Sequence, residues 1–212
     1  MSSATECADF TPQLLQQRAA ELIEAGRFLY EKGWVPATSG NFSARLSEQH
    51  AAITVSGRNK GALNVDDIMV VDMAGQAVGS DKRPSAETLL HTALYRRYAD
   101  VGCVLHTHSI NATLLSRRYG SALHLDGYEL LKAFRGVTTH ETSLTVPIFP
   151  NDQDIPRLST AVEQYLDGHE QVHGYLIAGH GLYTWGGSVA ETLRHLEAFE
   201  FLFQCEMHVL KG

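Results

Sequence analysis

The chain has 212 residues, of which 44% are hydrophobic, and both values are typical of a globular domain with a sizeable core. Its 24 acidic and 17 basic side chains give a formal net charge of -7. No run of Lys and Arg forms a nucleic-acid-binding patch, and no apolar run approaches the ~18–20 residues of a membrane span. We therefore expect neither nucleic acid nor a membrane as a partner.

The cysteines and the N-terminal segment indicate where the protein works. Three cysteines, at positions 7, 103 and 205, are too far apart for a CxxC metal site, and their odd number does not suit a disulfide framework. The first residues lack a basic region followed by an apolar segment, so they do not indicate a secretory signal. We expect a cytoplasmic protein, folded as one domain over residues 1–212, with residues 1–10 forming a flexible N-terminus.

Helices and strands are predicted to alternate in the first half of the chain. Capping residues and apolar residues at helical spacing predict helices over 11–33 and 82–98, the second with Ser85 as its cap. The segments between them are predicted to form a glycine-bearing polar turn with strand-like flanks over 36–45, a strand over 51–57 and a hairpin over 67–78.

The second half of the chain continues the alternation. Residues 101–106 are apolar on both sides, which predicts a strand in the middle of a sheet. The later elements are predicted as a helix over 109–118, a short helix or tight loop over 128–136, a strand over 144–150, a helix over 155–168, two strand pieces within 174–186 and a last helix from Ser188. Because several strands are joined by short turns, this order favours a mixed sheet between helical layers.

The segment GCVLHTHS places His106 and His108 at the end of the predicted central strand. Strand residues two apart point to the same face, so the two imidazoles could hold a divalent metal. Two polar residues at the mouth of a strand would give the same pattern. A catalytic zinc site usually takes three protein ligands, and His180, which lies between two glycines at another strand end, is the best remote candidate. Together the three histidines predict a metal site.

Two polar glycine turns, TSGN at 38–41 and SGRNKG at 56–61, can direct backbone N–H groups, hydroxyls and an amide toward an anion. Ser85, at the predicted start of a helix, would add further N–H groups and the positive end of the helix dipole. Plain turns between strands have a similar composition, and Lys60 could either neutralise a phosphate or be solvated.

Two glutamates are candidates for acid/base chemistry. Glu87 lies in the first turn of a predicted helix, where a carboxylate suits the helix dipole or could act beside a metal. Glu129, in LDGYELLKAF, lies either on the exposed face of a short helix or in a pocket that raises its pKa. The spacing does not choose between these alternatives.

Taken in order, the segments ATSGNFSAR, ITVSGRNKG, KRPSAETLLHTALYRR, VLHTHS and AGHGLYTWG resemble the class II aldolase family, which includes sugar-phosphate aldolases and epimerases. The resemblance covers residues 12–208 approximately. It implies an α/β fold, a three-layer α/β/α sandwich with a central mixed, largely antiparallel sheet. It also implies a homotetramer with sites at subunit interfaces.

The resemblance further implies a sugar-phosphate substrate and one Zn²⁺, or another divalent metal, on His106, His108 and His180. The residues that it places around the substrate phosphate are Thr38, Gly40, Asn41, Ser56, Gly57 and Ser85. Glu87 falls at the position of the aldolases' acid/base glutamate. The aldolases often have a second serine directly before it, but this chain has Ala86, so one phosphate donor is missing.

Within the family, LDGYELLKAFRG is most similar to the dehydratases of methylthioribulose 1-phosphate, in which a glutamate after the two histidines acts as acid/base. Glu129 matches that position, so the resemblance implies Glu129 as the main acid/base and Glu87 as the second candidate. The expected reaction removes water from 5-methylthioribulose 1-phosphate in methionine salvage. The alternatives are an aldolase or epimerase that uses the same metal enediolate, and a non-catalytic, adducin-like assembly module.

Overall fold

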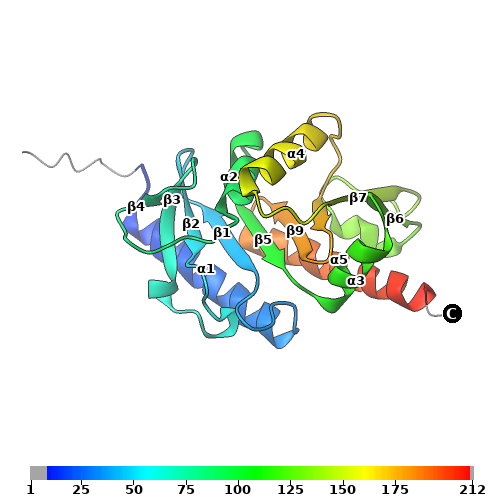
Figure 1. Ribbon diagram of the computed structural model, residues 1–212, viewed down its shortest axis with the longest axis horizontal. Coiled ribbons are helices and arrows are strands. Elements are labelled where there is room, and N and C mark those ends of the chain that lie inside the picture. The colour runs from blue at the N-terminus through cyan, green and yellow to red at the C-terminus, as the bar shows by residue number, and fades with distance from the viewer. Residues whose placement is uncertain (1–8, 211–212) are drawn as a thin grey trace, which may run out of the picture.

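A mixed β-sheet runs through the computed structural model, which describes residues 9–210 (Figure 1). Its strands are β1 (Asn41–Arg45), β2 (His50–Thr54), β3 (Ile68–Asp72), β4 (Ala77–Val78), β5 (Cys103–Thr107), β6 (Ala122–Asp126), β7 (Ser143–Phe149), β8 (Gly174–Ile177) and β9 (Gly181–Gly186). They form one nine-stranded sheet in the order β4-β3-β2-β1-β5-β9-β8-β7-β6. Only β7 and β8 pair in parallel, so the predicted mixed, largely antiparallel sheet is confirmed.

Helices cover both faces of this sheet (Figure 1). They are α1 (Pro12–Glu31), α2 (Thr88–Arg97), α3 (Ile110–Arg118), α4 (Ile155–Asp167) and α5 (Val189–Val209), with short 3-10 helices η1 (Lys60–Ala62), η2 (Val65–Asp67) and η3 (Glu129–Ala133). One core cluster joins the sheet to α1, α3 and α5, and a second joins it to α2 and α4. This arrangement confirms the three-layer α/β/α sandwich.

The strand with the two histidines lies at the centre of the sheet, as the sequence predicts. All of β5 is buried, and its side chains alternate between the two cores, with Leu105 in the first and Val104 in the second. β1 and β9 pair with it on either side, and their register places Asn41, His106 and Tyr183 in one row across the three strands. Because His106 lies two residues after Val104, this row faces the α2/α4 layer.

Two sequence predictions differ from the structure. Helix α2 begins at Thr88 instead of near Ser85, because the backbone N–H and hydroxyl of Thr88 bond to the Ser85 carbonyl, at 3.2 and 2.6 Å, in a preceding turn. The edge strand β6 was not predicted. It is five residues long and alternates buried with exposed side chains, a pattern too short to distinguish from a loop.

The expected flexible N-terminus falls largely outside the described residues, which exclude 1–8. Phe10 packs edge-on against His50, with ring centroids 5.5 Å apart, and joins the first core. Within residues 9–210, no helix combines the length and the apolar character needed to cross a bilayer.

Candidate metal and anion site

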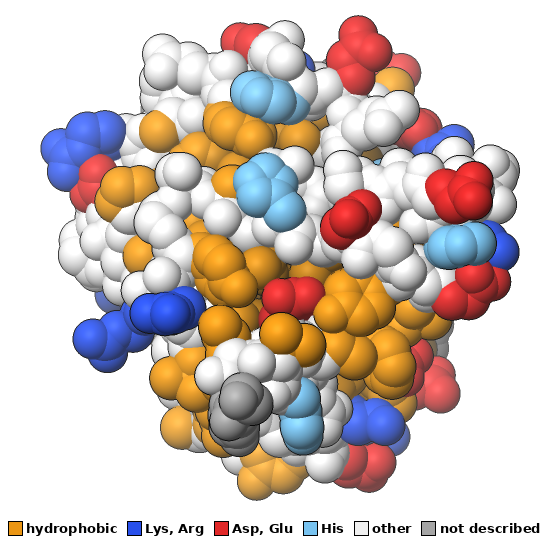
Figure 2. Space-filling model, turned by 90° about the vertical axis from the view of Figure 1, so that its right-hand side faces the viewer, with side chains coloured by type: hydrophobic (Ala, Val, Ile, Leu, Met, Phe, Trp, Pro, Cys, Tyr) orange, Lys and Arg blue, Asp and Glu red, His pale blue; other side chains and the backbone are white. Residues whose placement is uncertain are grey.

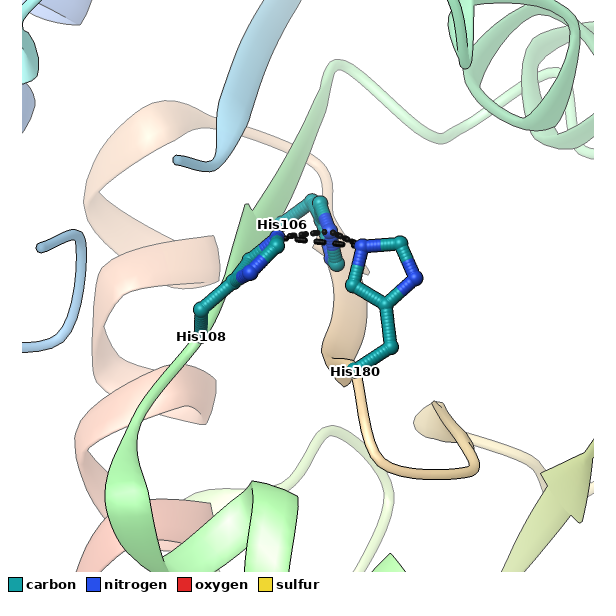
Figure 3. A group of neighbouring side chains, drawn as sticks. All are labelled: His106, His108 and His180. Carbon is teal, nitrogen blue, oxygen red and sulfur yellow. Dashed lines mark hydrogen bonds between the residues drawn. The ribbon is translucent and has the colours of Figure 1, made fainter. Parts of the chain in front are cut away.

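Three histidines converge where β5 ends and where β8 turns into β9 (Figure 3). The Nε2 atom of His106 lies 2.8 Å from that of His108 and 3.2 Å from that of His180, and the last two are 3.1 Å apart. The His106 side chain is fully buried, whereas the other two rings are half-buried. The structure thus brings together all three histidines that the sequence predicts as metal ligands.

Glycines allow the backbones around these histidines to approach each other closely. A Cβ atom on Gly181 would lie 1.9 Å from the carbonyl oxygen of Thr107, and one on Gly40 would lie 2.7 Å from that of His106. Any larger residue would therefore push β9 or the 36–40 turn away from the end of β5. The glycine after His180 is needed for a close approach, which agrees with the room that the sequence pattern indicates.

Hydrogen bonding and burial leave the His106 imidazole suited to bind a cation. Its Nδ1 lies 2.9 Å from the carbonyl oxygen of Leu182, which can only accept, so Nδ1 carries the proton and Nε2 presents a lone pair. Burial, and after it the neighbouring histidines, hold the pKa of His106 well below 6.5. Burial also lowers the pKa of His108 to about 4. Both rings are therefore neutral near pH 7, as metal ligands must be.

The donor set of this cluster fits a divalent metal. Imidazole nitrogens that converge without a cation repel one another, and tetrahedral ligands at ~2.0–2.1 Å from zinc would lie ~3.3 Å apart. The Nε2 separations of 2.8 to 3.2 Å are close to that value. A small outward movement of the rings would therefore admit the ion.

Glu87 lies against the same cluster. Its Oε1 is 3.3 Å from Nε2 of His180, and its Oε2 is 3.4 Å from Nε2 of His106. Oε2 also accepts hydrogen bonds from the Tyr183 hydroxyl at 2.7 Å and from the Asn41 amide at 2.8 Å. The carboxylate is held from two strands, with Oε1 free of these two donors. The structure therefore places Glu87 beside the metal-binding atoms.

A buried series of polar side chains continues behind this carboxylate. The Asn41 carbonyl oxygen bonds to Nε2 of His91, whose Nδ1 lies 2.7 Å from the hydroxyl of Ser43, and that hydroxyl lies 2.7 Å from the Tyr95 hydroxyl. Because the Asn41 amide donates to Glu87, its carbonyl must accept, so His91 is protonated on Nε2 and accepts on Nδ1. Burial lowers the pKa of His91 to about 4, which keeps the ring neutral. The residue pattern gave no sign of this series.

The predicted anion-binding residues meet at one cavity of about 200 Å³ beside the histidines. All six of them line it, together with Glu87, His108 and His180. The lining residues that the sequence analysis did not assign to the phosphate are Ser39, Thr54, Val55, Lys60 and Ala86. Residues from distant parts of the chain, including the two predicted anion turns and two of the three histidines, thus share one cavity.

Glu129 does not line this cavity. It begins η3, its side chain is 73% exposed, and it bonds to Lys132 Nζ at 2.6 Å. The Lys132 ammonium holds the pKa of Glu129 below its usual value, so within one chain Glu129 lies on the exposed face of a short helix and no pocket raises this pKa. Leu131 anchors η3 in the first core, on the face of the sheet opposite to His106. Within one chain, Glu129 is not brought to the histidines, and its catalytic role stays a prediction.

Comparison with known proteins identifies the family. The family model described as Class II Aldolase and Adducin N-terminal domain matches residues 20–207. A methylthioribulose-1-phosphate dehydratase from Methylococcus capsulatus is 61% identical over 198 residues, which cover 92% of this chain and 97% of that protein. One of the same name from Marinobacter nauticus is 60% identical over 195 residues, which cover 91% and 94%.

A solved structure supports the fold. The L-fuculose-1-phosphate aldolase from Thermus thermophilus superposes with a TM-score of 0.72 at 23% identity, covering 92% of this chain and 95% of that one. At this identity the likeness shows a common fold. The family match spans most of the sequence, and the five ordered motifs predicted it: the chain belongs to the class II aldolase and adducin N-terminal domain family.

Proposed function

We propose that the chain is a methylthioribulose-1-phosphate dehydratase, which removes water from 5-methylthioribulose 1-phosphate to give 2,3-diketo-5-methylthiopentyl 1-phosphate in methionine salvage. The observation that carries this proposal is an identity of 60 to 61% with proteins of that name over more than nine tenths of both chains. The intact cluster of histidines, with Glu87 against it, supplies the chemistry that such a reaction needs.

We propose that His106, His108 and His180 hold one divalent ion, with Zn²⁺ as the first candidate. Such an ion would polarise the substrate carbonyl and stabilise the negative charge that develops when the neighbouring carbon loses its proton. The protein's own contribution is to align the three imidazoles and to keep those of His106 and His108 neutral. The Nδ1–H of His106, bonded to the Leu182 carbonyl, does this for the most buried ring.

Glu87 is the group within this chain that can move a proton at the cluster. The reaction removes the C3 proton, expels the C4 hydroxyl as water and tautomerises the resulting enol to the diketone, so it needs a base and an acid. Tyr183 and Asn41 occupy Oε2, so we assign proton transfer to Oε1. The cavity wall from Thr38 to Ser85 would hold the substrate phosphate and align C3 with this oxygen.

We assign the second acid/base role to Glu129 of a neighbouring copy in a homotetramer. Exposed apolar side chains on α3 and the last turns of α5, such as Ile110 (75% exposed) and Val209 (70%), favour an interface there. Figure 2 shows the end of the molecule at which these helices lie, with apolar side chains gathered on it. Tyr128, next to Glu129, donates to Glu206 of α5 at 2.8 Å, and Ile110 follows the two histidines closely in the chain. Glu129 and the histidine cluster therefore both lie next to this surface.

The test of the reaction is one assay. Purified protein of measured metal content is given 5-methylthioribulose 1-phosphate, and the products are followed by mass spectrometry. We expect a diketone phosphate that has lost one water. Two smaller fragments would instead show an aldolase, an isomeric product would show an epimerase, and an unchanged substrate with metal-free protein would favour an assembly module.

A complementation experiment tests the shared site. His106→Ala and Glu129→Gln chains, each inactive alone, are unfolded together, refolded as a mixture and assayed with added metal. If Glu129 acts across an interface, mixed assemblies contain sites with both groups intact and regain part of the wild-type turnover. Absence of recovery in verified mixed oligomers would mean that Glu129 acts within its own chain and would overturn the shared site. We also propose a cytoplasmic setting, since Cys103 and Cys205 are free thiols.

A further inference from the structure

Lys60 is a buried ammonium in the wall of the anion cavity. Its side chain is only 1% exposed, so it is not the solvated lysine that the sequence also allowed. Within the described residues, no carboxylate oxygen lies within 4.0 Å of its Nζ. Asp67, whose charge does act on Lys60, is bound by Arg58 at 3.0 Å. A buried charge without an ionic partner is unfavourable unless a ligand supplies one.

The ammonium joins the two turns that the sequence predicted as anion-binding. Nζ donates to the carbonyl oxygen of Thr38 at 3.1 Å and to that of Arg58 at 2.7 Å. These carbonyls belong to the 38–41 and 56–61 turns, so Lys60 holds the turns side by side. An ammonium has three N–H donors, and these two bonds leave one available at the cavity that Lys60 lines.

Close backbone packing fixes the position of Lys60 independently of any ligand. A Cβ atom on Gly26 of α1 would lie 2.4 Å from the Lys60 carbonyl oxygen, and one on Gly61 would lie 2.4 Å from the ring of Tyr30. Helix α1 thus packs directly against η1. The lysine is positioned before substrate arrives, which is the arrangement expected of a binding residue.

We propose that Lys60 binds the substrate phosphate, giving its third N–H and its positive charge to the dianion. The residues predicted to bind the phosphate offer hydroxyl, amide and backbone groups without a positive charge. A charge-assisted hydrogen bond is about twice as strong as a neutral one, so Lys60 would be the strongest single contact of the phosphate. The inference rests on the proposed function, because it takes the ligand to be a sugar phosphate.

The experiment measures binding of inorganic phosphate to the metal-loaded protein by titration calorimetry. Lys60→Met removes the charge with little change of shape, and we expect the dissociation constant to rise about tenfold or more. Lys32→Met, on the exposed end of α1, is the matched control and should bind as the wild type does. Equal phosphate affinity in Lys60→Met and wild type would overturn the proposal, as would a wild type that does not bind phosphate.

Lys60→Gln tests the charge separately from the hydrogen bonds that hold the two turns together. Its amide still offers two N–H donors to the carbonyls of Thr38 and Arg58 but has no charge, so we expect phosphate affinity as weak as in Lys60→Met. Wild-type affinity in Lys60→Gln would overturn the role of the charge.

Steady-state kinetics separates this inference from the proposed function. With substrate, Lys60→Met should raise KM far more than it lowers kcat. Dehydration by the wild type together with unchanged KM in the variant would remove this inference and leave the proposed function. If the variant bound phosphate more weakly but the wild type did not dehydrate the substrate, the proposed function would be wrong and this inference would remain.

Discussion

Glu87 and Glu129 are two glutamates that the family resemblance assigns to catalysis, and the fold treats them differently. Glu87 is 15% exposed, and two strands donate hydrogen bonds to one of its oxygens. Glu129 is 73% exposed and is held by Lys132, three residues along the same short helix. A solvated pair of this kind fixes geometry weakly, whereas buried donors fix the first carboxylate before substrate binds.

The difference shows which part of the site one chain can complete by itself. The central strand β5 carries His106, and its neighbours β1 and β9 supply the two side chains that donate hydrogen bonds to Glu87. The η3 segment presents its glutamate on the surface, where a second copy could take it up.

Removal of a central histidine should have the largest effect. In His106→Ala the most buried imidazole is lost, and two half-buried ligands do not make a tight site. We expect metal content, measured by mass spectrometry, and turnover both to fall to background. His124→Ala, on the exposed face of β6, is the control and should keep both. Wild-type turnover in a metal-free His106→Ala protein would show that the buried centre is not where the reaction occurs.

Glu87→Gln and Glu129→Gln test the contrast directly. Loss of a general acid or base costs ~10²–10⁴-fold in turnover, and we expect Glu87→Gln to lie in this range with its metal retained. We expect Glu129→Gln to keep metal and thermal stability, because its side chain is exposed, and to lose ~10²-fold in turnover if it acts in the proposed shared site. Turnover within a few-fold of wild type for Glu129→Gln would assign the acid/base role to Glu87 alone.

The buried centre could be predicted from sequence because its ligands have distinctive types and spacings. His106 and His108 at strand spacing have a plain structural explanation by themselves, but together with His180 between glycines they favour a metal site. The central position of β5 followed from its apolar residues on both faces. The order of the elements predicted a mixed sheet between helical layers, and the family resemblance then implied the α/β/α sandwich; neither predicted the order of the strands.

Contacts between residues that are far apart in the chain could not be predicted from the sequence. Asn41 reads as a phosphate residue, but its side chain bridges Glu87 and His91 because β1 happens to lie beside β5. Lys60 reads as solvated or anion-binding, and only the approach of α1 at Gly26 decides that it is buried. Glu129 matched a motif, yet a motif does not show whether the residue lies near the histidines of its own chain. Such features depend on tertiary packing, which local sequence patterns do not predict.

Low pH should destabilise the folded protein through His91, which is buried behind Glu87. Its pKa in the fold is about 4, against 6.5 when unfolded, so between these values the unfolded chain binds the proton that the folded chain excludes. Stability from this group is therefore full above pH 6.5 and is lost as the pH falls toward 4. The difference corresponds to about 3 kcal/mol at most.

Urea unfolding of metal-free wild type and His91→Gln, at a series of pH values, measures this contribution as the difference between two curves. We expect the curves to converge as the pH falls from 6.5 to 4. His140→Gln provides the contrast, because His140 is exposed beside Glu129, and its curve should follow the wild type throughout. A constant offset between His91→Gln and wild type would mean that the histidine is not kept neutral by the fold.

The smallest effect concerns one hydrogen bond that distinguishes Glu87 from Glu129. Tyr183→Phe removes the hydroxyl that donates to Oε2 at 2.7 Å and leaves the donor from Asn41. We expect kcat to fall about tenfold with metal retained, which corresponds to the lower end for a hydrogen bond to a charged group.

Tyr175→Phe is the matched control for this change. Tyr175 stacks on Tyr183 in the next strand, with ring centroids 4.9 Å apart, but its buried hydroxyl has no partner among the described residues. Its removal should leave kcat within a few-fold of wild type. If both variants lost activity equally, the stacked rings would matter through packing alone. If only Tyr183→Phe lost activity, the hydrogen bond that orients the Glu87 carboxylate would contribute to turnover. The exposed Glu129 has no such buried donor.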